Sequence, residues 1–213
     1  MSLPLLIAHA SSSSVLIPLV IALLSRKHIT RDLFPLIILL IIALISDLIS
    51  LVFFKLGMNS YLIVNLFLLF QFFLCFLLLL GKARVTTTGN RAIAIGYTLL
   101  FFINLFFVQG MWKFNTYSNS LACLILMVLA LRYLYSLLRD LPELFIHQLP
   151  YFWIAAAVLT YYAGNLLLFL TNNYLTLGIE GSHQIMWILH NLLNISKNML
   201  FAIALWMNYR NKR

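Results

Sequence analysis

Residues 33–54 decide the fold of this chain, and they read LFPLIILLIIALISDLISLVFF. A helix needs about 20 mainly apolar residues to cross the hydrocarbon core of a bilayer. This stretch has that length, and Pro35 lies in its first turn, where the N–H that proline lacks would have no helical partner. One carboxylate, Asp47, interrupts the apolar run. The pattern predicts a transmembrane helix with a single acidic group deep inside it.

Six further apolar runs have a similar length and character, so we expect an all-α, polytopic bundle of seven transmembrane helices. The expected spans are residues 5–24, 33–54, 61–80, 92–109, 119–138, 150–170 and 183–209. The first span is the weakest, because it contains four consecutive serines, Ser11 to Ser14, and Pro18. The loops between the runs are too short for a soluble domain, so residues 1–213 are expected to form one transmembrane domain.

The composition excludes a water-soluble protein. The chain has 213 residues, of which 63% are hydrophobic and only 9% are charged, whereas soluble domains are about one quarter charged. A net charge of +9 would suggest a nucleic-acid partner in a soluble protein. Here the basic residues lie between the apolar runs on alternate loops, which is a topological pattern. We therefore expect the lipid bilayer as the partner, and no nucleic acid.

The basic residues predict the orientation. One side of the expected bundle carries Arg26, Lys27, Arg31, Lys82, Arg84, Arg91, Arg132, Arg139, Arg210, Lys212 and Arg213. The other side carries only Lys55 and Lys113. Because cytoplasmic loops are enriched in lysine and arginine, we expect the C-terminus in the cytoplasm and the N-terminus outside.

Polar side chains inside the spans are costly, so they carry most of the functional information. The last span holds the largest group: His190, Asn191, Asn194, Lys197 and Asn198. At about 100° per residue, these side chains occupy an arc of roughly 120° on the helix. This polar stripe is expected to face the bundle interior, toward the second, third or sixth span.

Asp47 and Lys197 are the one carboxylate and the one ammonium that lie deep in the expected membrane region. Asp47 lies ~12 Å from the outer end of its helix, and Lys197 ~18 Å from the outer end of its own. Because helical side chains tilt toward the N-terminus, Lys197 can reach the level of Asp47. Ser46 and Ser50 share the helix face of Asp47. We predict that Asp47 and Lys197 pair.

Further polar residues lie in the outer halves of other spans, which predicts an outward-facing cavity or a buried polar cluster there. The candidate ligand-binding or polar-network residues are Asp47, Ser50, Asn65, Asn165, His190, Asn194 and Lys197. The alternative is purely structural, because asparagine, serine and histidine also join membrane helices at about 0.6 kcal/mol for each hydrogen bond.

Three stretches resemble a group of small, largely uncharacterised seven-helix membrane proteins of bacteria. They are FNTYS at residues 114–118, PYFWI at residues 150–154 and WILHNLLNI at residues 187–195. The resemblance implies a seven-helix protein of the bacterial cytoplasmic (inner) membrane. It implies no particular activity.

The leading hypothesis for function is a membrane sensor or signalling component that binds a small ligand in the outer half of the bundle. The chain shows no output domain, so the signal would pass to a separate protein partner at the cytoplasmic surface from Arg132 to His147. We expect no cofactor and no enzymatic activity.

Three alternatives remain open. In a channel or transporter, Asp47, His190 and Lys197 would line an ion or proton path. An intramembrane metal hydrolase needs three protein ligands, and only His190 and Asp47 are placed for that role. A retinal protein would use Lys197 with Asp47 as its carboxylate partner, although the third span has no acidic residue.

Overall fold

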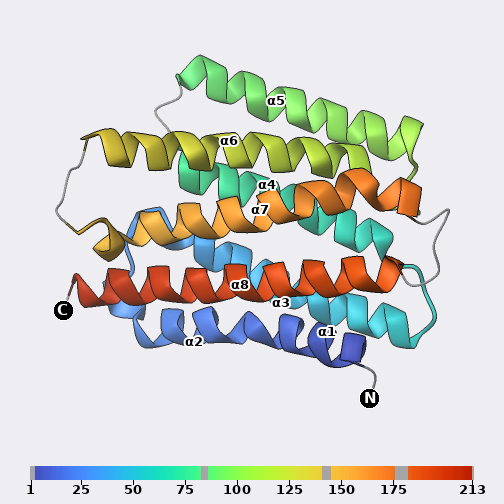
Figure 1. The fold of residues 1–213 in the computed structure, drawn as a ribbon, viewed down its shortest axis with the longest axis horizontal. Helices are drawn as coiled ribbons and strands as arrows, with labels where there is room; N and C mark the ends of the chain where they lie inside the picture. The colour runs from blue at the N-terminus through green and yellow to red at the C-terminus, as the bar shows by residue number, and fades with distance from the viewer. Residues whose placement is uncertain (1–2, 83–85, 141–144, 176–181, 213) are drawn as a thin grey trace.

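The computed structural model describes residues 3–82, 86–140, 145–175 and 182–212. Within these residues the fold is all-α (Figure 1), and seven helical segments are long and apolar enough to cross a membrane. The helices are α1 (Leu3–Ser14), α2 (Leu16–Leu24), α3 (Phe34–Lys55), α4 (Tyr61–Leu80), α5 (Thr87–Ile103), α6 (Thr116–Asp140), α7 (Pro150–Leu175) and α8 (Ser182–Arg210). Three short 3-10 helices, η1 (Arg26–His28), η2 (Arg31–Leu33) and η4 (Ile146–Gln148), and one π-helical segment, η3 (Asn104–Val108), complete the described set. The predicted seven-helix architecture is confirmed.

The first span, expected to be the weakest because of its serines and Pro18, is interrupted. It consists of α1 and α2, which meet at Val15. Pro18 has no N–H, so the carbonyl of Ser14, four residues earlier, loses its helical partner. The Ser14 hydroxyl donates to the Ser11 carbonyl at 2.6 Å, and both serines are buried against the bundle.

The fourth span begins earlier than predicted. We expected it to start at Ala92, but α5 begins at Thr87 and continues through Arg91. Thr86 explains the difference, because its hydroxyl accepts a hydrogen bond from the Gly89 N–H at 3.2 Å and caps the helix. The start of α5 is therefore set by a side-chain cap, which a hydropathy pattern does not reveal.

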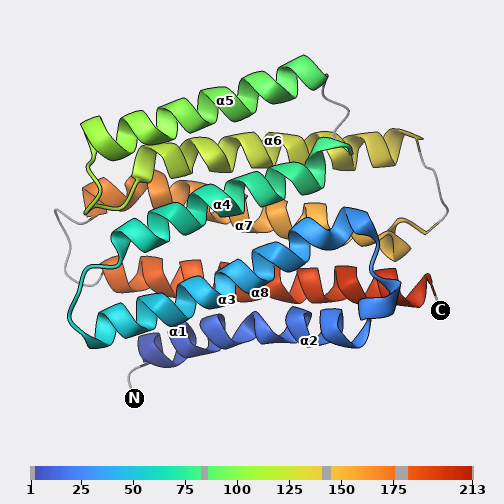
Figure 2. The same cartoon turned by 180° about the vertical axis from the view of Figure 1, so that it is seen from behind.

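The two chain ends lie at opposite ends of the bundle (Figures 1 and 2). We call these the N-terminal end and the C-terminal end. The connections at residues 56–60 and 109–115 lie at the N-terminal end, with the start of α8. The orientation of these ends relative to the cytoplasm stays a prediction.

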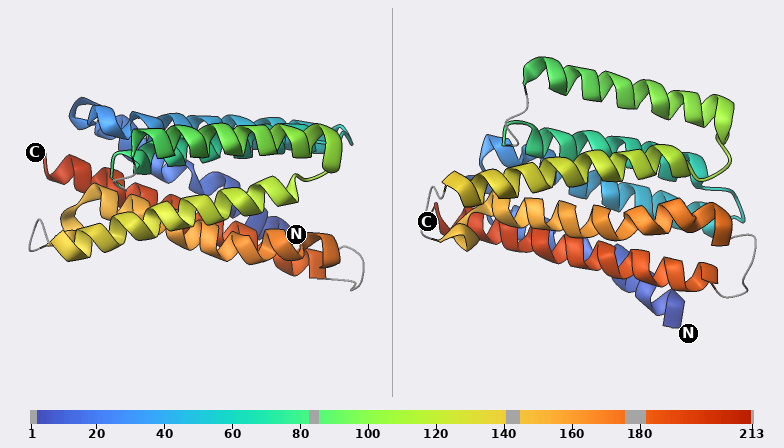
Figure 3. Two further views of the ribbon diagram at one scale, coloured as in Figure 1. Left: turned by 90° about the horizontal axis from the view of Figure 1, so that it is seen from above. Right: turned by 45° about the horizontal axis from the view of Figure 1, so that its top comes forward.

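Helix α8 is the centre of the packing, because it contacts α7 along its length and also α1 and α2. Helix α3 packs mainly on α4. Figure 3 shows α3 and α8 close together toward the C-terminal end and further apart toward the N-terminal end. The helices therefore form a wedge that widens toward the N-terminal end.

The interior at the C-terminal end of the wedge is filled by apolar side chains. Fully buried residues from four helices meet there: Leu36, Leu40, Leu79, Ile154, Phe201 and Leu205. Many large apolar side chains point outward instead, among them Leu48, Leu99 and Phe107. An apolar outer surface of this kind suits a bundle whose solvent is lipid.

Candidate functional site

A cavity of about 490 Å³ occupies the wide end of the wedge. Its walls come from α1, α3, α4, α7 and α8, together with residues 109–114 before α6. Ligand pockets usually measure about 300–1,000 Å³, so this volume suits a small organic molecule. Four of the predicted site residues line it: Asp47, Ser50, His190 and Asn194.

One wall of the cavity is polar and is built by α1 and α3. Ser46, Asp47 and Ser50 lie on one face of α3 because their spacing matches a helical turn. Ser11 and Ser12 of α1 line the cavity as well, and Ser12 lies near the Asp47 carboxylate. A carboxylate with four serines on the same wall therefore borders the cavity about two helical turns from the end of α3.

The remaining walls are largely aromatic. They carry Tyr61, Phe67, Phe114, Tyr161, Phe169 and Trp187. The sequence offered a partial signal for two of them, because Tyr161 and Phe169 flank Asn165 at intervals of four residues on α7. Trp187 was not among the predicted site residues, yet it borders the cavity beside His190, with ring centroids 5.8 Å apart.

His190 is held in a defined orientation by α7. Its Nδ1 lies 2.6 Å from the Asn165 Oδ1, and the Asn165 Nδ2 donates to the Tyr161 carbonyl at 2.7 Å. The Asn165 amide nitrogen is thus committed to the backbone, so its oxygen accepts a hydrogen bond from the His190 Nδ1–H. A neutral imidazole then has Nε2 as an acceptor. Asn165 is fully buried and does not line the cavity, so it acts as a support for His190.

Lys197 does not form the predicted ion pair with Asp47. In the described part of the chain, ion pairs within 4.0 Å join Lys82 to Asp32 and Arg139 to Asp140. The Lys197 Nζ instead lies 4.3 Å from the centroid of the Tyr161 ring, in a cation–π contact. Asp47 still lies near enough to interact with it electrostatically.

The divergence of α3 and α8 is the physical reason for this correction (Figure 3). The two side chains have similar depths, but depth alone does not bring them together across a widening wedge. Lys197 is buried, with 4% of its surface exposed, and it is absent from the lining of the cavity. The Tyr161 side chain lines the cavity and its ring also contacts Lys197, so Lys197 supports the cavity wall from behind this ring.

The polar stripe of α8 faces two helices. His190 and Lys197 turn toward α7, the sixth span, as predicted. Asn194 turns toward the first span instead, where its Nδ2 donates to the Ser11 Oγ at 2.9 Å. Asn198 repeats this contact one turn later, donating to the Ser14 Oγ at 2.7 Å. The expected direction was wrong for Asn194, because α1 rather than α3 packs on this face of α8.

Asn65 is also a support rather than a lining residue. Its Nδ2 donates to the Lys113 carbonyl at 2.9 Å, and its Oδ1 accepts from the Asn115 N–H at 3.0 Å. The segment it holds carries Lys113 and Phe114, both of which line the cavity. A second amide cluster continues from there, since the Asn104 Nδ2 hydrogen-bonds to Asn115 and to Ser118. These bonds fix the wall next to η3.

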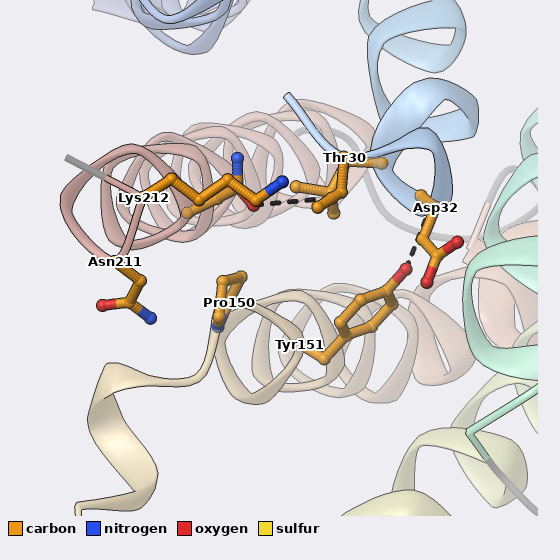
Figure 4. A pocket seen from close by; sticks show the side chains of 8 residues that line it. Thr30, Asp32, Pro150, Tyr151, Asn211 and Lys212 are labelled. Carbon is orange, nitrogen blue, oxygen red and sulfur yellow. Dashed lines mark hydrogen bonds between the residues drawn. The ribbon is translucent and has the colours of Figure 1, made fainter. Parts of the chain in front are cut away.

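A second cavity, of about 310 Å³, lies at the C-terminal end (Figure 4). Thr30, Asp32, Tyr151 and Lys212 are among its lining residues. The Tyr151 hydroxyl donates to the Asp32 carbonyl at 3.0 Å. Lys82 lies 4.4 Å from the centroid of the Tyr151 ring and 3.8 Å from the Asp32 carboxylate. This cavity has fewer aromatic walls, and its polar groups chiefly bind one another.

Comparison with protein-family models, curated proteins and solved structures finds no match for this chain. The site must therefore be interpreted from its own chemistry. Among the described residues, no three histidine, cysteine, aspartate or glutamate side chains gather closely enough to hold a metal ion.

Proposed function

We propose that this protein is a membrane sensor that binds a small ligand in the cavity at the N-terminal end. The supporting observation is that the residues lining the cavity all lie between the middle of the bundle and the N-terminal end. The cavity lies above the packed apolar layer around Leu40, Ile154 and Phe201, each of which is at most 1% exposed. A pocket at one end of the bundle, with packed apolar side chains at the other end, is suited to holding a ligand, whereas a conduit requires a polar path from end to end.

Helix α8 supports a route from the ligand to the opposite end. It carries Trp187, His190 and Asn194 at the cavity. Three turns or more further on, the Asn208 Nδ2 donates to the His28 carbonyl at 3.0 Å in the connection between α2 and α3. A helix is stiff along its axis, so a shift at the cavity would change this contact. In our proposal, α8 transmits occupancy of the cavity to the C-terminal end.

The proposed orientation places the cavity outside and the C-terminal end in the cytoplasm, as the basic loops predict. The output would be a protein partner at the surface from Arg132 to His147. Residues 141–144 of this surface lie outside the described residues. On either side, Tyr135 and Phe145 are well exposed, at 66% and 56%, and could contact such a partner.

The second candidate function is a proton or ion transporter. One observation favours it, because buried polar groups continue below the cavity. The Gln71 Nε2 donates to the Tyr162 hydroxyl at 3.0 Å, and this hydroxyl contacts the Cys75 Sγ at 3.8 Å. Cys75 in turn lies close to Lys197. These groups reach only the middle of the bundle, so a conduit would need a second conformation.

The proposal can be tested by filling the cavity with a side chain. Ser50→Trp adds bulk inside the cavity, whereas Leu51→Trp adds the same bulk to an exposed position of the same helix. Spin labels at Lys27→Cys and Tyr135→Cys would report distances at the C-terminal end, since the native Cys75 and Cys123 are buried. We expect the distance distribution to move with Ser50→Trp and to stay unchanged with Leu51→Trp.

Two results would contradict the sensor. One is an unchanged C-terminal end in both tryptophan variants, which would remove the coupling. The other is ion or proton flux into protein-containing liposomes above that of empty liposomes, abolished by Asp47→Asn. That second result would support the transporter instead.

A further inference from the structure

Among the described residues, no cationic side chain forms an ion pair with the Asp47 carboxylate within 4.0 Å. The neutral side chain of Ser12 lies near it. The nearest buried cation, Lys197, is directed onto the Tyr161 ring. Among the lining residues that the structure describes, Asp47 is the one carboxylate, and it borders open space. An acidic group at membrane depth is costly unless a counter-charge lies close by, and here the cavity is the free side on which a counter-charge can bind.

The remaining lining is suited to a cation with an organic body. The six aromatic side chains defined above line the same cavity as Asp47. Aromatic faces attract ammonium groups, most strongly where water is excluded. They also provide apolar area for the rest of the ligand. The Nε2 of neutral His190 adds a hydrogen-bond acceptor, and the hydroxyls of Ser46 and Ser50 add two more.

An anionic ligand fits these groups poorly. Lys113 is the one lysine or arginine among the described lining residues, and it belongs to the connection at the mouth rather than to the depth of the cavity. Lys197 lies behind Tyr161 and is absent from the lining. An anion at the level of Asp47 would meet a like charge without a facing cation.

We propose that the ligand of this cavity is a small organic ammonium ion, whose nitrogen binds Asp47 and whose apolar body lies against the aromatic wall. This inference rests on the proposed ligand-binding function and adds the chemical class of the ligand. The hydroxyls next to Asp47 favour a protonated amine with N–H donors, because each N–H can then find an oxygen acceptor.

The test uses three probes of similar size and different charge: phenethylammonium, 2-phenylethanol and 3-phenylpropanoate. Binding is measured by equilibrium dialysis against the protein in nanodiscs of zwitterionic lipid, and empty nanodiscs correct for partition into lipid. A charge-assisted hydrogen bond to a carboxylate is worth enough to favour the ammonium probe over the alcohol by about tenfold or more. High salt should weaken only the ammonium probe.

The matched variants are Asp47→Asn and Asp32→Asn, which remove one carboxylate at each end of the molecule. We expect Asp47→Asn to reduce the preference for the ammonium probe to about the level of the alcohol, and Asp32→Asn to leave it unchanged. The ranking of the three probes on the unmodified protein needs no variant, so it remains decisive even where Asp47→Asn folds poorly.

The ligand class is overturned by tighter binding of the alcohol or the carboxylate, by an absence of saturable ammonium binding, or by an unchanged preference in Asp47→Asn. Failure of the sensor itself is distinguishable, because it appears in the Ser50→Trp distance measurement, which uses no ligand. Binding of the neutral probe alone, with coupling intact, would preserve the sensor and reject the ammonium ligand.

Discussion

Replacing Gly164 by alanine should force α7 away from α8 at the depth of the cavity. A Cβ atom added at Gly164 would lie 2.5 and 2.7 Å from the two Cδ atoms of Leu193, and 3.2 Å from its Cγ. Carbon atoms in contact prefer a separation of about 3.5–4.0 Å. Because the Cγ is crowded as well as the methyl groups, rotation of the leucine end does not remove the whole overlap.

The expected magnitude follows from two opposing effects. Alanine in a helix interior is favoured over glycine by about 0.5–1 kcal/mol. Crowding in a well-packed core costs about 1–3 kcal/mol. The difference is a net loss of up to about 2.5 kcal/mol, and the contact with the Leu193 Cγ favours a loss above about 1 kcal/mol. Since Leu193 precedes Asn194, the shift should also weaken the bond from Asn194 to α1.

The assay is thermal unfolding in detergent micelles, with Gly96→Ala as the control. Gly96 also lies in a membrane-spanning helix, but an added Cβ meets nothing within 4 Å there. We expect Gly96→Ala to be neutral or mildly stabilising, and Leu193→Ala to recover part of the loss in the Gly164→Ala background. Equal stability of Gly164→Ala and Gly96→Ala would refute the close approach of α7 and α8 on which this reasoning depends.

Three further outcomes are expected. Asn198→Ala should lower the free energy of unfolding by about 0.6–1.7 kcal/mol, since it removes one hydrogen bond between the first and last spans; an unchanged unfolding midpoint would contradict this. A double-mutant cycle of Asp47→Asn with Lys197→Met should give a coupling energy well below the roughly 3–5 kcal/mol cost of breaking a buried ion pair, because the two groups are not in direct contact; coupling of that size would restore the direct pair. In intact cells, an impermeant thiol reagent should label Met58→Cys but should reach Lys212→Cys only after the cells are lysed, and the reverse pattern would invert the predicted orientation.

The sequence predicted the helices well because the length and apolarity of a membrane span are set by the bilayer. The interruption of the first span was not predicted, because the expected span ran unbroken from residue 5 to residue 24; its serines and Pro18 indicated only that it was the weakest span. The start of α5 was missed because Thr86 caps it through a single side-chain hydrogen bond. Such a cap depends on local backbone geometry, whereas hydropathy is an average over many residues and carries no information about that geometry.

The site was harder to predict because polar residues of one depth can have different roles. Asp47 and His190 border the cavity, whereas Asn65 and Asn165 are fully buried and hold the walls. The sequence gives the depth of each residue and its face on its own helix. It does not give the angle between α3 and α8. That angle determines whether a cavity opens between the helices and which side chain Lys197 can contact.

The hydrogen bonds between α1 and α8 also bear on how the protein is made. The serines of the first span find their partners 183 and 184 residues later in the chain, at Asn194 and Asn198. During synthesis the first span enters the bilayer long before the last one leaves the ribosome. Until then its serine hydroxyls can bond only within their own helix or to water near the membrane surface. We therefore expect the first span to remain loosely inserted and to take its final depth only when α8 arrives, so that a segment made early is among the last to be assembled.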